Sequence, residues 1–91
     1  MDAKLILLSL SLDLKRITTA IQRNSSAVDT FNQEASKWLH KAKKLNNNKL
    51  QNLLQKVEKT LETKNDLEKA EDCLMYSILI QNQALYGTKP A

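Results

Sequence analysis

The chain has 91 residues, 42% hydrophobic side chains, one glycine, one proline and a formal net charge of +4. A chain of this length forms one domain. A sheet protein needs turn residues about every 8–12 positions, and here Gly87 and Pro90 both fall in the last five residues, so the fold class is all-α. The single cysteine, Cys73, cannot form an internal disulfide, which predicts a reducing compartment such as the cytoplasm.

One apolar seam runs through the first half of the chain in steps of three and four residues. Its positions are Ala3, Leu7, Leu10, Leu14, Ile17, Ile21, Asn24, Val28, Phe31, Ala35, Trp38, Ala42 and Leu45. Twelve of these thirteen residues are apolar, and the spacing is that of a coiled-coil seam. It predicts a helical arm over residues 2–45, with Asp2 as its N-cap.

The segment 5–12 (LILLSLSL) is apolar on all sides and follows Lys4. Asp13, Lys15 and Arg16 come directly after it, where a cleavable signal peptide would have small neutral residues. The segment is also too short to span a bilayer. We therefore expect it to belong to the core of a helical domain, with no membrane partner.

Three asparagines at 46–48 predict a turn, because asparagine is a poor helix former and tolerates left-handed backbone. A second arm is predicted over residues 49–86, with Gly87 as a left-handed cap and a tail at 87–91. Its seam is Leu50, Leu53, Val57, Thr60, Lys64, Leu67, Glu71, Leu74, Ile78, Gln81 and Leu85.

Two arms of similar length around a short turn predict an antiparallel helical hairpin of two long helices in a single domain, residues 1–91. Capping-box spacings at Ser26 with Asp29 and at Asn65 with Glu68 leave an alternative, a compact single-chain bundle of three or four helices. The heptad phase continues across both sites, which favours continuous or gently kinked arms.

Two stretches, 5–14 and 73–80, are apolar all round. In a hairpin they meet at the same end, and two helices alone cannot cover them. We expect a second copy or another helical protein to complete a four-helix bundle there. The predicted partner interface consists of Leu5, Leu7, Leu10, Leu14, Leu74, Ile78 and Leu85.

The charge gathers near the predicted turn. Residues 37–64 hold eight lysines and two glutamates, whereas residues 1–36 are balanced. The hairpin would therefore have an apolar base and a basic tip. Lysines bind phosphates without reading sequence, so the alternative function is nucleic-acid binding, or contact with another acidic partner, through Lys37, Lys41, Lys43, Lys44 and Lys49.

The chain shows no catalytic or metal-binding motif. His40 is the only histidine and reads as a surface residue, Cys73 reads as a small core residue, and no glycine-rich loop is present to cradle a phosphate. The predicted function is therefore a non-enzymatic helical module for protein–protein interaction, without a cofactor, acting as an adaptor, assembly factor or small chaperone.

The paired arms, Ala3 to Leu45 and Leu50 to Leu85, are similar in architecture to the small helical chaperones of bacterial type III secretion systems. Those chaperones are hairpins that shield an amphipathic helix of a partner. The resemblance implies a sequestering role and identifies no site residue.

Overall fold

The computed structural model describes residues 2–45 and 47–87. They form four α-helices, α1 (Ala3–Gln22), α2 (Val28–Ala42), α3 (Asn48–Glu62) and α4 (Asp66–Asn82), and a single π-helical turn, η1 (Gln83–Gly87), that continues α4. No strand occurs among these residues, so the predicted all-α class is confirmed.

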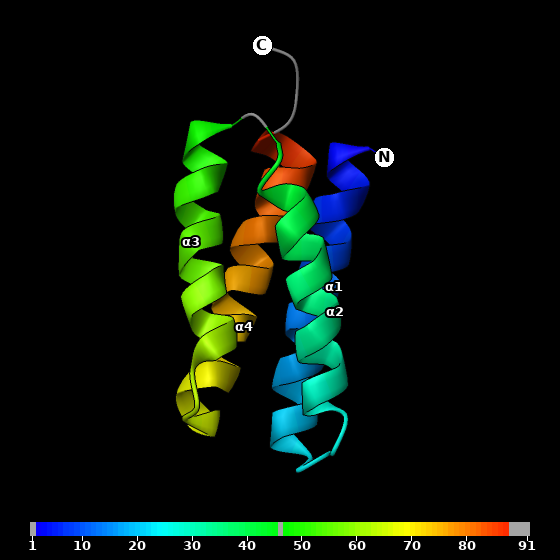
Figure 1. Ribbon diagram of the computed structural model, residues 1–91, viewed down its shortest axis with the longest axis vertical. Coiled ribbons are helices and arrows are strands. Elements are labelled where there is room, and N and C mark those ends of the chain that lie inside the picture. Colours follow the sequence, from blue (N-terminus) through cyan, green and yellow to red (C-terminus); the bar gives the residue numbers. More distant parts are fainter. Residues whose placement is uncertain (1, 46, 88–91) are drawn as a thin grey trace.

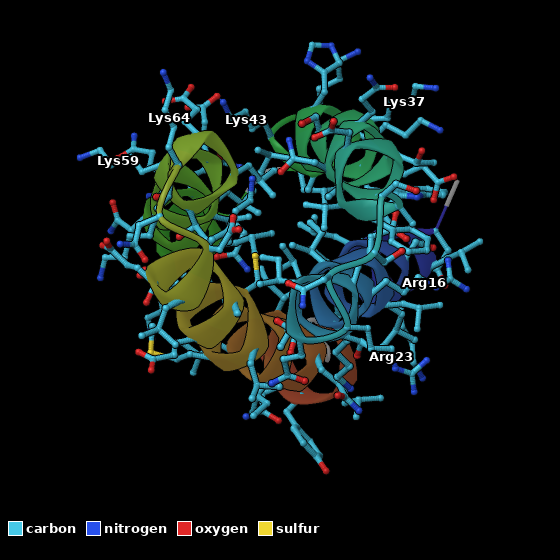
Figure 2. All side chains as sticks on the ribbon, turned by 90° about the horizontal axis from the view of Figure 1, so that it is seen from below. Arg16, Arg23, Lys37, Lys43, Lys59 and Lys64 are labelled. Atoms are coloured by element: carbon cyan, nitrogen blue, oxygen red, sulfur yellow. The ribbon has the colours of Figure 1, made fainter. Side chains whose placement is uncertain are left out.

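The helices run alternately down and up (Figure 1), and in the end-on view of Figure 2 each lies beside the next around the bundle axis. The α2–α3 turn lies at the same end as the first turn of α1 and the last turn of α4, whereas the α1–α2 and α3–α4 connections lie at the other end. This is the up-down-up-down four-helix bundle, here completed by one chain.

The prediction of two long arms is wrong. An arm of more than forty residues would reach about 65 Å at about 1.5 Å per residue, but the molecule extends 42 × 21 × 18 Å. Its radius of gyration of 12.5 Å matches the roughly 12 Å expected of a compact domain of this length. The compact bundle is therefore the correct alternative, and the hairpin on which the resemblance to secretion chaperones was based is absent.

The first break lies at Asn24, where α1 ends. Asn24 has φ 51, and the amides of Asn24 and Ser25 donate to the carbonyls of Ile21 and Ala20. This is the Schellman arrangement with a left-handed asparagine after the helix. The capping box at Ser26 that the alternative bundle suggested is absent, because α2 begins after Ala27, which provides no side-chain cap.

The remaining helix starts follow the sequence more closely. The Asp2 carboxylate accepts from the Lys4 amide at 3.2 Å, so the predicted cap of α1 is confirmed. Asn65 Oδ1 accepts from the Glu68 amide at 2.9 Å, which is the cap that the alternative bundle suggested. Asn47 caps α3 through the Leu50 amide; Asn46, inside the predicted turn, lies outside the described residues. Gly87 does not have a positive φ, so its predicted left-handed cap is wrong.

The core collects the inward side chains of all four helices. Its fully buried large residues include Leu7, Leu10, Leu14, Ile17, Leu50, Leu54, Val57 and Ile80. The apolar segment after Lys4 thus lies in the bundle as a core helix, as predicted. Among the described residues, no helix has the length and hydrophobicity needed to cross a membrane.

Candidate protein interaction surface

The inward side of α4 is built from small side chains. Ala70, Cys73 and Ser77 are buried there, and Ala84 of η1 continues the row. The large buried members are Ile80 and Lys69, whose ammonium donates to the Leu61 carbonyl, and Tyr76 packs against the core half-buried. Small residues let two helix backbones approach closely. The inward row of α4 therefore needs little volume to pack against its neighbours.

The contact between α1 and α4 has the short distances that such packing allows. Ser11 Oγ donates to the Ser77 carbonyl at 2.7 Å, and Thr18 Oγ1 donates to the Ala70 carbonyl at 2.8 Å. Both hydroxyls are buried, so they need these partners. These two bonds fix the position of α4 along the axis of α1.

Five large apolar side chains of α4 and Tyr86 of η1 point away from the core. They are 41–71% exposed, and we call them, with the polar residues between them, the outer face of α4: Leu67, Leu74, Met75, Ile78, Leu79 and Tyr86. A bundle helix usually places its large apolar residues inward and its polar residues outward. In α4 most of the large apolar residues point outward, and most of the residues that face the core are small.

A hollow of about 420 Å³ lies beside this face, in the groove between α1 and α4. Its walls are Thr18, Ile21 and Gln22 of α1 and Leu67, Ala70, Glu71 and Leu74 of α4. The exposed Leu67 and Leu74 form one of its edges. The groove gives an incoming side chain an apolar place to insert.

Only some residues of the predicted partner interface are exposed in the structure. Leu5, Leu74 and Ile78 are exposed and Leu85 is half-buried. Leu7, Leu10 and Leu14 are fully buried in the core of the chain, so the folded bundle cannot present them to a partner. They lie in one core cluster with residues of α2, α3 and α4, so the chain itself provides the cover that the sequence assigned to a second copy.

The charges on this side change sign along the bundle. Asp66, Glu68 and Glu71 are exposed on the first half of α4, and Asp72 is half-buried beside them. Near the other end, the Lys15 ammonium of α1 donates to Gln81 Oε1 at 2.8 Å. The outer face of α4 is thus acidic at one end and has a cation from α1 at its side toward the other end.

The five lysines of the predicted basic tip are all exposed. They are divided between the hollow beside α1, lined by Lys37 and Lys41, the hollow beside α3, lined by Lys43, and the α2–α3 turn. Lys41 Nζ lies 4.5 Å from the centre of the Trp38 ring, on the side of α2 that faces α1, while Lys43 forms an ion pair with Glu58 of α3. Lys44 and Lys49 flank the α2–α3 turn. Figure 2 shows the labelled cations projecting from α1, α2, α3 and the residues after α3.

The expected separation of apolar base and basic tip is also wrong. The up-down-up-down course brings the α2–α3 turn to the end where α1 starts and α4 ends (Figure 1). The apolar and basic regions therefore share one end of the bundle, but they lie on different helices.

Sequence reasoning missed a groove between α1 and α2. Two hollows of about 430 and 400 Å³ share Leu12 and Arg16 as lining residues. The Arg16 guanidinium lies 5.7 Å from the centre of the Phe31 ring. The signal was present, since Arg16 and Arg23 are seven residues apart, as are Phe31 and Trp38, which puts each pair on one side of its helix.

The floor of this groove contains a buried carboxyl group. Asp13 is 3% exposed, and burial raises its pKa, with a further contribution from the negative charge of Glu34. Arg16, whose Nη1 lies 3.2 Å from Asp13 Oδ1, acts in the opposite direction. The ionised form of Asp13 is therefore less stable in the bundle than in water.

Cys73 and His40 lie where the sequence predicted. Cys73 is fully buried, and burial raises the pKa of its thiol to about 11, so the thiol stays protonated at neutral pH. His40 is exposed on α2. In the described part of the chain, no group of three or more His, Cys, Asp and Glu side chains has a geometry able to hold a metal ion.

Comparisons with protein-family models, with curated proteins and with solved structures found no match to this chain.

Proposed function

We propose that this protein is a helical interaction module that docks an apolar helix of another polypeptide on the outer face of α4. The observation that carries the proposal is the reversed distribution of side-chain sizes on α4. The bundle packs against Ala70, Cys73 and Ser77, while Leu67, Met75 and Ile78 remain exposed. Packing of the single chain has no use for those large side chains.

The exposed side chains represent a substantial unused free energy of burial. Covering one Leu, Ile or Met contributes about 1.5–3 kcal/mol when the side chain is fully removed from water, and five such residues lie exposed on α4. Monomeric proteins rarely expose contiguous apolar patches of this kind unless they mark a binding site. A partner helix laid along α4 would bury several of them at once.

The proposal involves no catalytic step and no cofactor. The module works by burying surface, as an adaptor, assembly factor or small chaperone would. Its single buried cysteine suits a reducing compartment, and we place its action in the cytoplasm.

The direct test is titration of a labelled synthetic amphipathic helix with the 91-residue chain at low chain concentration, followed by fluorescence anisotropy. The peptide has leucine at heptad positions a and d and lysine elsewhere, which complements the carboxylates of Glu68 and Glu71. We expect Ile78→Asp to weaken binding at least about tenfold, since one buried Ile is worth about 1.5–3 kcal/mol.

The matched control is Leu12→Asp. Leu12 is 47% exposed and Ile78 is 49% exposed, but Leu12 lies on α1, beside the groove to α2. L12D should bind the peptide as the wild type does. Absence of binding by the wild type, or equal binding by I78D, would contradict the proposed function.

A second candidate function is binding of single-stranded nucleic acid in the α1–α2 groove. The observation that favours it is the meeting of Arg16, Phe31, Trp38, Lys37 and Lys41 along two adjoining hollows. Cations and aromatic rings in one groove are the usual elements of such sites. The buried Asp13 and neighbouring Glu34 work against it.

This candidate is tested with a labelled mixed-sequence oligonucleotide over a range of salt concentrations. Binding there predicts that affinity falls steeply with salt and that Arg23→Ala and Lys37→Ala each reduce the log–log slope by about one. Lys59→Ala, on the far side of α3, is the control. Absent or salt-independent binding removes this candidate.

A further inference from the structure

The six large apolar residues of the outer face of α4 are spaced symmetrically along the chain. Leu67 and Tyr86 are equally far from the midpoint between Tyr76 and Ser77. The same midpoint lies halfway between Leu74 and Leu79, and halfway between Met75 and Ile78. Reversing the direction of the helix therefore leaves its pattern of exposed apolar residues unchanged.

Such a pattern is what a twofold contact requires. In an isologous dimer, residue i of one copy meets residue j of the other, and j meets i in return. If two copies of α4 lie antiparallel with the axis at the midpoint, Leu67 comes level with Tyr86 of the second copy. Met75 likewise comes level with Ile78, so that apolar residues meet apolar residues along the helix.

The exposed positions also follow the spacing of a helix–helix seam. Leu67, Glu71, Met75, Ile78, Asn82 and Tyr86 are separated by three or four residues, so they share one side of the helix. Leu74 and Leu79 lie on either side of this row. The arrangement suits antiparallel packing of side chains between those of the opposite helix.

The polar residues favour the antiparallel arrangement over the parallel one. In the antiparallel register, Glu71 comes level with Asn82 of the second copy and Asp72 with Gln81, whose side chain already accepts from Lys15. Carboxylates thus face amides and a nearby cation. In a parallel pair the acidic start of α4 would face the same acidic segment of the other copy, which is unfavourable.

We propose that the occupant of the outer face of α4 is a second copy of this chain, bound antiparallel about a twofold axis at the midpoint between Tyr76 and Ser77. This inference rests on the proposed function and names its partner. The two bundles would join through α4 and η1, leaving the α1–α2 groove and the whole of α3 outside the contact.

The first experiment measures molar mass by light scattering and sedimentation equilibrium over a range of concentrations. The wild-type chain should pass from 10.4 kDa toward twice that mass as the concentration rises. I78D should remain monomeric, and L12D should associate like the wild type. Circular dichroism and a melting curve establish that each variant is folded.

The second experiment tests the register with a charge at position 82. Asn82→Lys places two new cations opposite the two copies of Glu71, and Asn82→Glu places two carboxylates there. We expect the dimer dissociation constant to fall about two- to tenfold in N82K and to rise by a similar factor in N82E. Asn52→Lys and Asn52→Glu, exposed on α3, make the same charge changes away from the face and control for net charge.

The outcomes separate this inference from the proposed function. A chain that stays monomeric at all concentrations but binds the amphipathic peptide in an Ile78-dependent way overturns the dimer and retains the interaction module. A dimer that survives in folded I78D overturns this use of the outer face of α4. Changes of the same sign in N82K and N82E overturn the antiparallel register.

Discussion

Helices α3 and α4 belong to the same bundle and have similar lengths, but they use their side chains in opposite ways. The buried residues of α3 are the large apolar Leu50, Leu54, Val57 and Leu61, together with Thr60. Its outer side carries polar and charged residues such as Asn52 and Lys56. In α4 the inward row is small and the outer side is largely apolar.

The difference between α3 and α4 shows which large apolar residues the bundle needs for its own core. The large apolar side chains of α3 are the ones that lie in the core. The apolar seam predicted from the sequence therefore matches the packing of this helix. In α4, Ile80 is the one large apolar residue that is fully buried, and Ala70, Cys73 and Ser77 fill most of the remaining inward positions. The large residues on the other side are therefore available for a contact outside the chain.

The largest effect that would sharpen this comparison is expected at the core of α3. Leu54→Ala removes a fully buried side chain and should lower the free energy of unfolding by about 2–5 kcal/mol, since a cavity is left as well as lost burial. Urea denaturation followed by circular dichroism measures this loss. A loss below about 1 kcal/mol would mean that α3 packs loosely enough to collapse around the cavity.

The inward side of α4 should respond to added volume. Ser77→Leu places a large side chain where Ser77 is fully buried and where its carbonyl accepts from Ser11 Oγ. We expect a loss of about 1–3 kcal/mol from overpacking, measured in the same denaturation experiment. A stability equal to that of the wild type would contradict the close approach of α1 and α4.

The N-terminal ends of the two helices should behave alike, in contrast with their faces. Asn47 and Asn65 each cap a helix through one side-chain oxygen, so N47A and N65A should each cost about 1 kcal/mol of stability. Thermal melting gives both values. If N65A costs nothing, the bond from Lys69 Nζ to the Leu61 carbonyl is sufficient to hold the start of α4.

Asp13 lies on α1, and its effect on stability can be compared with the effects of residues on α3 and α4. Because its pKa is raised in the bundle above the ordinary value of 3.8, its ionisation opposes folding at neutral pH. Asp13→Asn should therefore raise the melting temperature by a few degrees at pH 7. The gain should shrink as the pH falls and vanish below 3.8, where the carboxyl group is protonated in both the folded and the unfolded chain.

Melting curves of D13N and the wild type at several pH values measure this dependence. A gain that is the same at every pH would show that packing of the amide, and not the loss of a charge, is responsible.

The smallest effect is expected on the outer face of α4. Ile78→Ala removes a half-exposed side chain and should change the stability of the monomeric bundle by no more than about 0.5 kcal/mol. The measurement is made at a concentration where the mass is monomeric. A loss of free energy of unfolding as large as that of L54A would mean that the outer face of α4 contributes as much to the fold as the core of α3. It would contradict the contrast between the two helices.

The sequence was sufficient for the fold class, for the buried seam of α1 and for that of α3. It was insufficient for α4, because Leu67, Leu74 and Ile78 fit a heptad and have large side chains, whereas Ala70 and Ser77 do not stand out as core residues. Only the hydroxyl bonds across the α1–α4 contact show why small residues lie inward. Those bonds depend on residues more than fifty positions apart.

The continuous phase across Asn24 misled the prediction of long arms. Two antiparallel helices that face one core also have their seams in phase when the connection has a suitable length, and α1 and α2 show this with Ile17 and Ala35 both buried. The candidate surface was partly predicted, since Leu74 and Ile78 belong to it. Leu5 is also exposed, but it lies on α1. The symmetry of the candidate surface became visible only once exposed and buried residues were separated.

The pairing of the first helix with the last has a consequence for synthesis of the chain. Ser11 finds its partner 66 residues later, at Ser77. At about 5–20 residues per second, translation leaves the α4-facing side of α1 uncovered for a period on the order of seconds. A chain that ends after α3 lacks this cover altogether, so the nascent protein reaches its stable form only when α4 has left the ribosome.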